Sequence, residues 1–283
     1  MPVGFLTPAQ EAQYGHFTTT PTAAQLAQYF WLDEADREII DRHRGAHNRW
    51  GFALQLTTVR FLGTFLTDPI NVPPNVLRYV AQQLQIAPLT PLAPYATSRM
   101  HKAHTAEIRQ VYGYRTFTDQ PGHFRFVRWL YERAWLTTDR PSVLFDAATA
   151  HCVEHKVLLP GVTVLTRLVA QVRERAALRL WRTLARLPTA DQRESLEQLL
   201  RGDPATHHTG LDRLRQAPTT VSAPGLLKAV QRAETFRAFG AYQWAFGSIP
   251  LGRIQLLARY AAQARAQIIA RMGADRRHAT LVV

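Results

Sequence analysis

The chain has 283 residues, of which 46% are hydrophobic, and its formal net charge is +13. This hydrophobic content is enough to bury folded cores and excludes wholesale disorder, and the single cysteine, Cys152, excludes an intramolecular disulfide. No uninterrupted apolar run reaches the ~18 residues of a membrane-spanning helix, and the first residues lack the pattern of a signal peptide. We therefore expect a soluble, cytoplasmic protein with no membrane partner.

Arginine carries almost all of the positive charge, because Lys102, Lys156 and Lys228 are the only lysines. The planar guanidinium fits both phosphate and the edge of guanine, so an arginine-rich chain favours nucleic-acid binding. A solvated surface encoded by a GC-rich genome would give the same composition.

Helix start and stop signals recur along the first part of the chain. Thr7 and Thr22 each begin a capping-box pattern, and Asp33 can cap a helix that runs to about residue 44. A long apolar helix is expected over about 48–66, and the next over about 74–84. Together these elements predict a first helical DNA-binding domain over residues 1–86.

Three prolines interrupt the next segment, APLTPLAPYAT, at residues 87–97. We expect it to form an extended linker without a helix, and to separate the first two domains.

The second predicted domain covers residues 98–201 and also consists of helices. They are expected over 98–113, 121–136, 141–156 and 162–187, with a turn at LLPG between the last two. A loop at 202–210 precedes further helices near 222–239 and 250–272, in a region over 202–283. The apolar end, ATLVV, carries no stop signal, so we expect either that the chain continues or that another surface covers it.

No segment alternates apolar and polar residues with period two, so the sequence predicts an all-α fold. The order of elements predicts tandem helical bundles that contain helix-turn-helix-like DNA-binding modules.

The predicted helix from residue 162 separates two kinds of side chain by helical spacing. One face is apolar. The other carries the basic and polar residues Arg167, Gln171, Arg175, Arg179, Arg182 and Arg186. A stripe of one sign repels itself unless a polyanion neutralises it, which favours a contact with DNA or RNA.

The segment before this helix gives it the order of a helix-turn-helix. Thr163, Thr166 and Arg167 would lie at the N-terminal end of the second helix, where base contacts are usually made. A plain helical hairpin with a basic outer face is the alternative.

A second basic cluster precedes the apolar helix of the first domain, in RHRGAHNRWGFALQL at residues 42–56. It lies at a turn and a helix N-terminus, where backbone N–H groups favour phosphate. We predict DNA contacts from Arg42, Arg44, His47, Asn48 and Arg49.

Metal binding and catalysis find little support in the sequence. His43 and His47, and likewise His151 and His155, have helical spacing but lack the further ligands of a zinc site. The sequence contains no nucleophile elbow, phosphate-cradling glycine loop or clustered carboxylates. We therefore predict no catalytic residue, no metal site and no cofactor in this chain.

Several stretches resemble the N-terminal region of the Tn3-family transposases. They include MPVGFLTPAQEAQYGHF, DREIIDRHRGAHNRWGFALQLTTVRFLGTFLTDP, VPPNVLRYVAQQL, EIRQVYGYRTFTD, RWLYERAWLTTDRPSVLFDAATAHCVEHKVLLPGVTVLTRLVAQVRERA and VSAPGLLKAV. The resemblance spans essentially the whole chain, and R-x-G-F-A-L-Q-L followed by R-F-L-G-x-F is its most specific piece. Trp50 departs from the leucine expected before GFALQL, and His101 and Lys102 depart from an aromatic pattern.

The resemblance implies tandem helical domains that bind double-stranded DNA at the terminal inverted repeats of a transposon. It also implies a bacterial protein that is associated with the nucleoid and can form a dimer when complete. It also implies that the acidic triad and its magnesium ions belong to a downstream domain with no counterpart in this sequence. The DNA-binding residues expected are Arg42, Arg44, His47, Asn48, Arg49, Thr163, Thr166, Arg167, Gln171, Arg175, Arg179 and Arg182. A stand-alone regulator that competes for transposon ends and a metal-dependent nuclease remain as alternatives.

Overall fold

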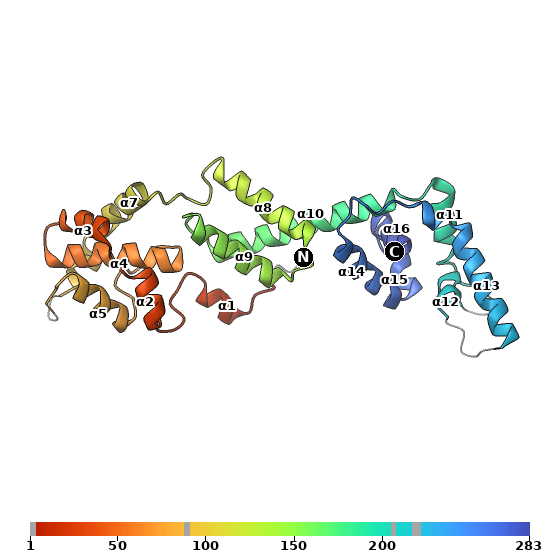
Figure 1. Ribbon diagram of the computed structural model, residues 1–283, viewed down its shortest axis with the longest axis horizontal. Helices are drawn as coiled ribbons and strands as arrows, with labels where there is room; N and C mark the ends of the chain where they lie inside the picture. Colours follow the sequence, from red (N-terminus) through yellow and green to blue (C-terminus); the bar gives the residue numbers. More distant parts are fainter. Residues whose placement is uncertain (1–3, 88–90, 205–207, 217–221) are drawn as a thin grey trace. The chain divides into compact units, whose positions relative to one another are not determined.

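A computed structural model describes residues 4–87, 91–204, 208–216 and 222–283 of the chain (Figure 1). These residues form α-helices and one short 3-10 helix, and within them no strand occurs beyond two isolated bridges. The prediction of an all-α fold is confirmed. No helix in these ranges combines the length and the apolar character needed to cross a membrane.

The chain divides into two compact units. Unit 1 comprises residues 1–128 and 141–170, and unit 2 comprises residues 129–140 and 171–283. These units do not follow the boundaries expected at 87–97 and 202–210. Whether the segments 1–86 and 98–201 act as separate DNA-binding domains stays a prediction.

Unit 1 contains most of the helices that the sequence predicts. They are α1 (Pro8–Gln13), α2 (Ala23–Tyr29), α3 (Glu34–Asp41), α4 (Ala46–Leu62), α5 (Pro74–Gln83), α6 (Ala93–Thr97), α7 (Met100–Tyr112) and α9 (Pro141–Glu154). The helices α8 (Gly122–Leu136) and α10 (Val162–Ala185) begin in this unit and end in the other. Both capping boxes, at Thr7 and Thr22, are formed, and Asp33 caps α3.

Helix α4 forms the centre of the main core of unit 1, where α2, α3, α5, α6, α7 and α9 contact it (Figure 1). All its residues from Trp50 to Val59 are buried, in agreement with the apolar pattern. Its neighbours add Phe30, Leu32, Ile40, Val76, Val80 and Ile108 to the same cluster. Burial of this apolar surface is the main stabilising contribution to the unit.

A buried ion pair joins α3 to α4. The guanidinium of Arg60 donates to both carboxylate oxygens of Asp36, at 2.8 and 2.6 Å, and the Tyr112 hydroxyl donates to the same carboxylate at 2.9 Å. Asp36 is only 1% exposed. Burial lowers the pKa of Arg60, but the hydrogen bond and charge of Asp36 outweigh it and leave this pKa raised.

The prediction of an extended linker without a helix at residues 87–97 is partly wrong, because residues 93–97 form helix α6. Pro94 stands in the first turn, where a missing N–H costs nothing, and Tyr95 is fully buried. Residues 88–90 lie outside the described residues. The segment after them packs on α4 and α7 instead of extending between domains.

Two glycines, Gly51 within α4 and Gly63 at its end, allow neighbouring helices to approach α4 closely. A Cβ at Gly51 would lie 2.3 Å from the ring of Tyr95, so only glycine admits the α6 side chain here. Gly63 has a φ of +73° and ends the helix at Leu62, four residues earlier than expected. A Cβ at Gly63 would also lie 2.7 Å from Val153 of α9.

Unit 2 contains the remaining helices: α11 (Ala190–Gln198), α12 (Gly210–Arg215), α13 (Ala223–Ala238), the 3-10 helix η1 (Ala241–Gln243), α14 (Leu251–Gln263), α15 (Ala266–Ala270) and α16 (Ala274–Val282). The helix expected over 250–272 is two helices, because residues near Ala264 are extended. The apolar end of the chain forms α16, which packs on α11, α14 and α15 and buries Val282. The burial of Val282 agrees with the expected alternative that another surface covers this apolar end.

We predict that Gly51→Ala lowers the free energy of unfolding by about 1–3 kcal/mol, because the added methyl must displace the buried Tyr95 ring. Chemical denaturation of the purified chain measures this change. Gly161→Ala is the control, since its Cβ would meet nothing within 4 Å. An effect of Gly51→Ala no larger than that of the control would contradict the packing described for α6.

Candidate nucleic-acid interface

The first candidate surface is the α3–α4 turn, defined as residues 42–49. Gly45 is the N-cap residue before helix α4 and has a φ of +86° and a ψ of 136°, a conformation that residues with a side chain rarely adopt. No side chain caps this N-terminus. The turn therefore presents the positive end of a seventeen-residue helix, which favours an anion.

The predicted residues of this turn lie in different environments. Arg42 and Arg44 are exposed. Arg49 lies 3.3 Å from the Asp41 carboxylate, although both side chains remain largely accessible. His47 and Asn48 are half-buried, and Asn48 donates to the Arg44 carbonyl at 2.9 Å. Arg42 and Arg44 are thus the residues best placed to meet a phosphate.

His43 points inward, unlike its neighbours. Its ring lies 4.5 Å from that of Phe52 and 4.3 Å from that of His104, and its Nε2 is 3.5 Å from the Glu107 carboxylate. His47 is not part of these contacts. The helical spacing of His43 and His47 therefore does not bring them into one described cluster.

A buried network of polar side chains lies next to the α3–α4 turn, where the ring of His104 contacts that of His43. Tyr95 contacts Nδ1 of His104 through its hydroxyl at 3.0 Å and accepts a hydrogen bond from Gln55. His104 is almost fully buried. Burial lowers its pKa to about 4, with a further contribution from the neighbouring His43 and His101. His104 is therefore neutral at pH 7.

The second candidate surface is the start of α10 together with the turn before it, residues 155–167. The turn is held to two other segments of unit 1. Leu158 donates its N–H to the Arg115 carbonyl at 2.9 Å, and Leu159 donates to the Gly63 carbonyl at 2.9 Å. Two helices joined by this fixed turn match the helix-turn-helix order that the sequence predicts, whereas the DNA-binding role of that order stays a prediction.

The predicted residues at the start of α10 do not all face outward. Thr163 and Arg167 are exposed. Thr166 is 4% exposed, and its hydroxyl donates to the Val162 carbonyl at 2.7 Å. The hydroxyl is used within the helix, so the expected base contact of Thr166 does not agree with its position. Thr166 was predicted from its place at the N-terminal end of the helix, which does not show on which face a residue lies.

The rest of the stripe belongs to unit 2, and two of its arginines have partners there. Gln171 and Arg175 are exposed. The guanidinium of Arg179 lies 4.3 Å from the Trp135 ring, and Arg182 lies 3.7 Å from the Asp275 carboxylate. Such contacts within the unit leave Arg175 more available to DNA than Arg179 or Arg182.

Two further cations join the second surface. Arg115 and Lys156 are exposed, and the Arg115 N–H donates to the Lys156 carbonyl at 2.9 Å. Neither residue was predicted from the sequence, because 41 residues separate them along the chain and only tertiary structure pairs them. Val164, which is exposed at the start of α10, was not predicted either.

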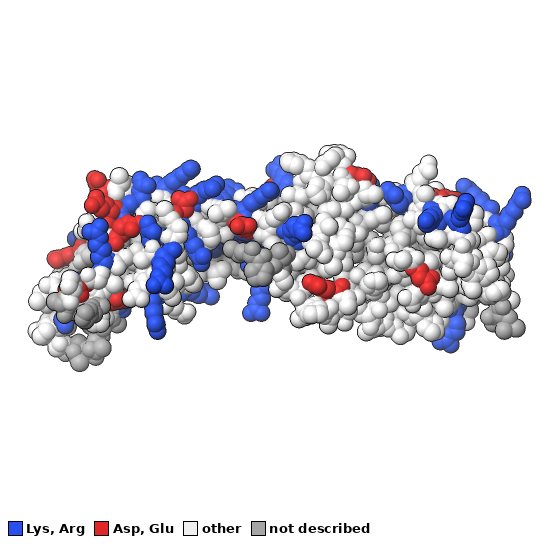
Figure 2. All heavy atoms as spheres, turned by 180° about the vertical axis from the view of Figure 1, so that it is seen from behind, with Lys and Arg blue, Asp and Glu red and all other residues white. Residues whose placement is uncertain are grey.

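Charge on the molecular surface agrees with this basic character. Figure 2 shows one face on which Lys and Arg side chains are spread widely and Asp and Glu are fewer. Such a surface attracts a polyanion over several ångströms, without specifying which one.

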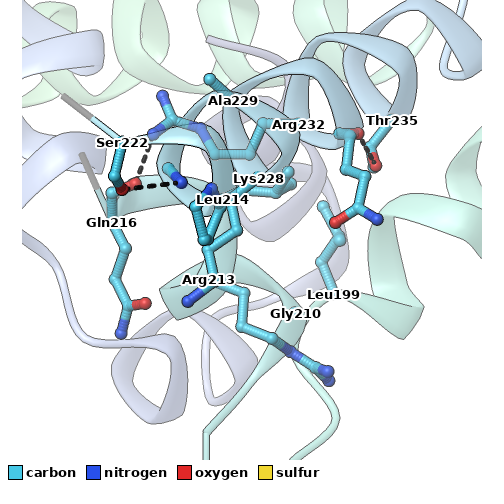
Figure 3. A pocket seen from close by; sticks show the side chains of 13 residues that line it. Leu199, Gly210, Arg213, Leu214, Gln216, Ser222, Lys228, Ala229, Arg232 and Thr235 are labelled. Atoms are coloured by element: carbon cyan, nitrogen blue, oxygen red, sulfur yellow. Dashed lines mark hydrogen bonds between the residues drawn. The ribbon is translucent and has the colours of Figure 1, made fainter. Parts of the chain in front are cut away.

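Unit 2 also contains a basic pocket of about 1050 Å³ between α12 and α13. Arg213, Lys228 and Arg232 line it (Figure 3). Arg232 donates to the Gln216 carbonyl, and Asp203 lies 3.8 Å from Arg213. The pocket has a positive character that suits an anion, but none of the predicted site residues lines it.

The sequence of this chain matches a known protein family. Residues 5–172 match the family model described as "Domain of unknown function (DUF4158)". The chain belongs to the DUF4158 family. Both candidate surfaces of unit 1 lie within the matched residues.

Transposases are similar to this DUF4158 chain over most of its length. The transposase for transposon gamma-delta from Escherichia coli (strain K12) is 45% identical over 99% of the chain and 28% of the relative. The transposases for transposons Tn3926 and Tn21, both from Escherichia coli, are 31% and 29% identical over 91% of the chain and 26% of each relative. These matches confirm the resemblance to the N-terminal region of Tn3-family transposases. The chain spans about a quarter of the length of these relatives.

The described part of this DUF4158 chain contains no group of three or more His, Cys, Asp or Glu side chains placed to hold a metal ion. That this chain holds no metal or cofactor stays a prediction.

We predict that protonation of His104 destabilises unit 1 as the pH falls. Its folded pKa of about 4 lies below the ordinary value of about 6.5, so the unfolded state binds the proton first. The contribution of neutral His104 to stability is complete above pH ~6.5 and is lost as the pH falls toward 4. Denaturation of wild type and His104→Gln at several pH values measures the effect.

The variant should show a shallower loss of stability than wild type between pH ~6.5 and 4. The exposed His16 provides the control substitution, His16→Gln, which should follow the wild-type curve. Parallel curves for wild type and His104→Gln would show that His104 does not titrate as described.

Proposed function

We propose that this chain is the DNA-binding N-terminal part of a transposase and that it recognises the terminal inverted repeats of a Tn3-type transposon. The observation that carries the proposal is the exposed N-terminal end of α10, with Thr163 and Arg167, on a helix that follows a fixed turn. The printed names of the relatives, all transposases for transposons, supply the biological context. Strand cleavage and transfer are assigned to residues outside this chain.

In this proposal, the two surfaces of unit 1 have different tasks. The α3–α4 turn binds phosphate through Arg42, Arg44 and the positive end of α4, and so fixes the register on the duplex. The start of α10 enters the major groove, where Arg167 can donate two hydrogen bonds to O6 and N7 of a guanine. Thr163 is close enough along the helix to donate to a neighbouring base or phosphate.

Residues farther along α10 extend the same chemistry. Gln171 can pair in a bidentate manner with adenine, and Arg175 can neutralise a phosphate. Arg115 and Lys156 add charge beside the turn that precedes α10. The other predicted residues of the α3–α4 turn act mainly by maintaining its shape. Arg49 pairs with Asp41, Asn48 donates to the Arg44 carbonyl, and His47 is half-buried.

A gel shift tests the proposal on a duplex with the inverted-repeat sequence of a Tn3-type transposon and on a scrambled duplex of equal length and composition. We expect at least tenfold tighter binding to the inverted repeat, at roughly 0.15 M salt, and affinity that falls steeply as salt rises. Equal affinity for both duplexes would overturn the proposed specificity. A flat response to salt would overturn DNA binding itself.

Substitutions can distinguish phosphate binding by the α3–α4 turn from base recognition by the start of α10. The double substitution Arg42→Ala and Arg44→Ala should reduce the slope of log K against log salt by about 2, equally on both duplexes. Arg167→Ala should instead reduce the preference for the inverted repeat by roughly fivefold or more. Arg78→Ala, at an exposed arginine of α5, is the matched control and should change neither quantity.

A further inference from the structure

Val164 is an exposed apolar side chain on the face of α10 that we assign to DNA. It is 52% exposed, whereas Leu165 and Val169, its apolar neighbours in the same helix, are fully buried. Exposed valines are common on protein surfaces. Val164 differs in that it lies among the polar side chains that we propose to contact DNA.

Helical spacing places Val164 among the residues that would face the major groove. With about 100° per residue, Val164 lies within roughly 60° of Arg167 and roughly 20° of Gln171 around the helix axis. Its own N–H donates to the Gly161 carbonyl at 2.9 Å, so Val164 belongs to the first turn. Residues of the first turn of a recognition helix are the ones that approach base edges most closely.

The chemistry of valine selects one kind of partner on DNA. Valine offers no hydrogen bond, so it gains nothing from a phosphate or from a polar base edge. The C5 methyl group of thymine is the apolar group that marks a base pair in the major groove, and small apolar side chains contact it. The β-branched side chain is also stiff, so little conformational entropy is lost on contact.

We propose that Val164 contacts the C5 methyl group of a thymine in the major groove and thereby adds thymine specificity beside the base contacted by Arg167. This inference rests on the proposed function, because it requires that the start of α10 enters the major groove. It assigns a specificity-determining role to a residue that helical charge patterns do not reveal.

Deoxyuridine tests the contact directly, because it differs from thymidine only in lacking the C5 methyl. The probe is the duplex that wild-type chain enriches from a random-sequence pool, resynthesised with each thymidine replaced by deoxyuridine in turn. At one position, the replacement should weaken wild-type binding roughly fourfold, the effect of removing one buried methyl group. Val164→Ala should weaken binding to the unmodified duplex by a similar factor.

The two changes should not add, because both remove the same contact. Val164→Ala should therefore bind the deoxyuridine duplex no more weakly than the thymidine duplex. Val143→Ala is the matched control, since Val143 is also an exposed valine of unit 1, at 43%, near the start of α9. It should leave the affinity and the deoxyuridine effect unchanged.

The outcomes separate this inference from the proposed function. If a sequence is enriched but no deoxyuridine weakens binding, or if the two losses add, the thymine contact is overturned and specific DNA binding stands. Additive losses would show that Val164 contributes to binding independently of the thymine methyl group. If no sequence is enriched, the proposed function fails, and the inference fails with it.

Discussion

The bidentate ion pair between Asp36 and Arg60 is the interaction on which the geometry of unit 1 depends. It joins α3 to α4 in a site where both charges are largely removed from water, and Tyr112 satisfies the same carboxylate from α7. A buried pair of this kind adds little net stability, but it penalises every arrangement that separates its members. The angle between α3 and α4, and hence the exposure of Arg42 and Arg44 in the turn between them, follows from this constraint.

Helix α4 also contacts the turn that forms part of the second candidate surface. Gly63 ends the helix in a left-handed conformation and leaves room for Val153 of α9. Its carbonyl accepts the Leu159 N–H from the turn that leads into α10. The same helix therefore positions the α3–α4 turn at its start and the α9–α10 turn at its end. Both surfaces that we propose to contact DNA are built on one buried element.

Much of this fold could be predicted from sequence because its signals are local. Capping residues such as Thr22 and Asp33 and apolar periodicity in α4 depend on neighbours within a few positions, and the structure bears them out. Helix α6 was missed because the burial of Tyr95 depends on Gly51, 44 residues away, which no local pattern reveals. Arg115 and Lys156 were missed for the same reason. Thr166 was predicted from its place at the start of the helix, but that place does not reveal its burial or the hydrogen bond from its hydroxyl to the Val162 carbonyl.

Hydrogen–deuterium exchange of the chain with and without a duplex carrying the transposon inverted repeat tests the central claim most directly. We predict that DNA slows exchange in two segments of unit 1, around residues 42–49 and 161–168. Residues 190–198, which form α11 in unit 2, should exchange equally in both states. Bound DNA that leaves exchange at 161–168 unchanged would contradict the assignment of α10 as the element that reads the bases.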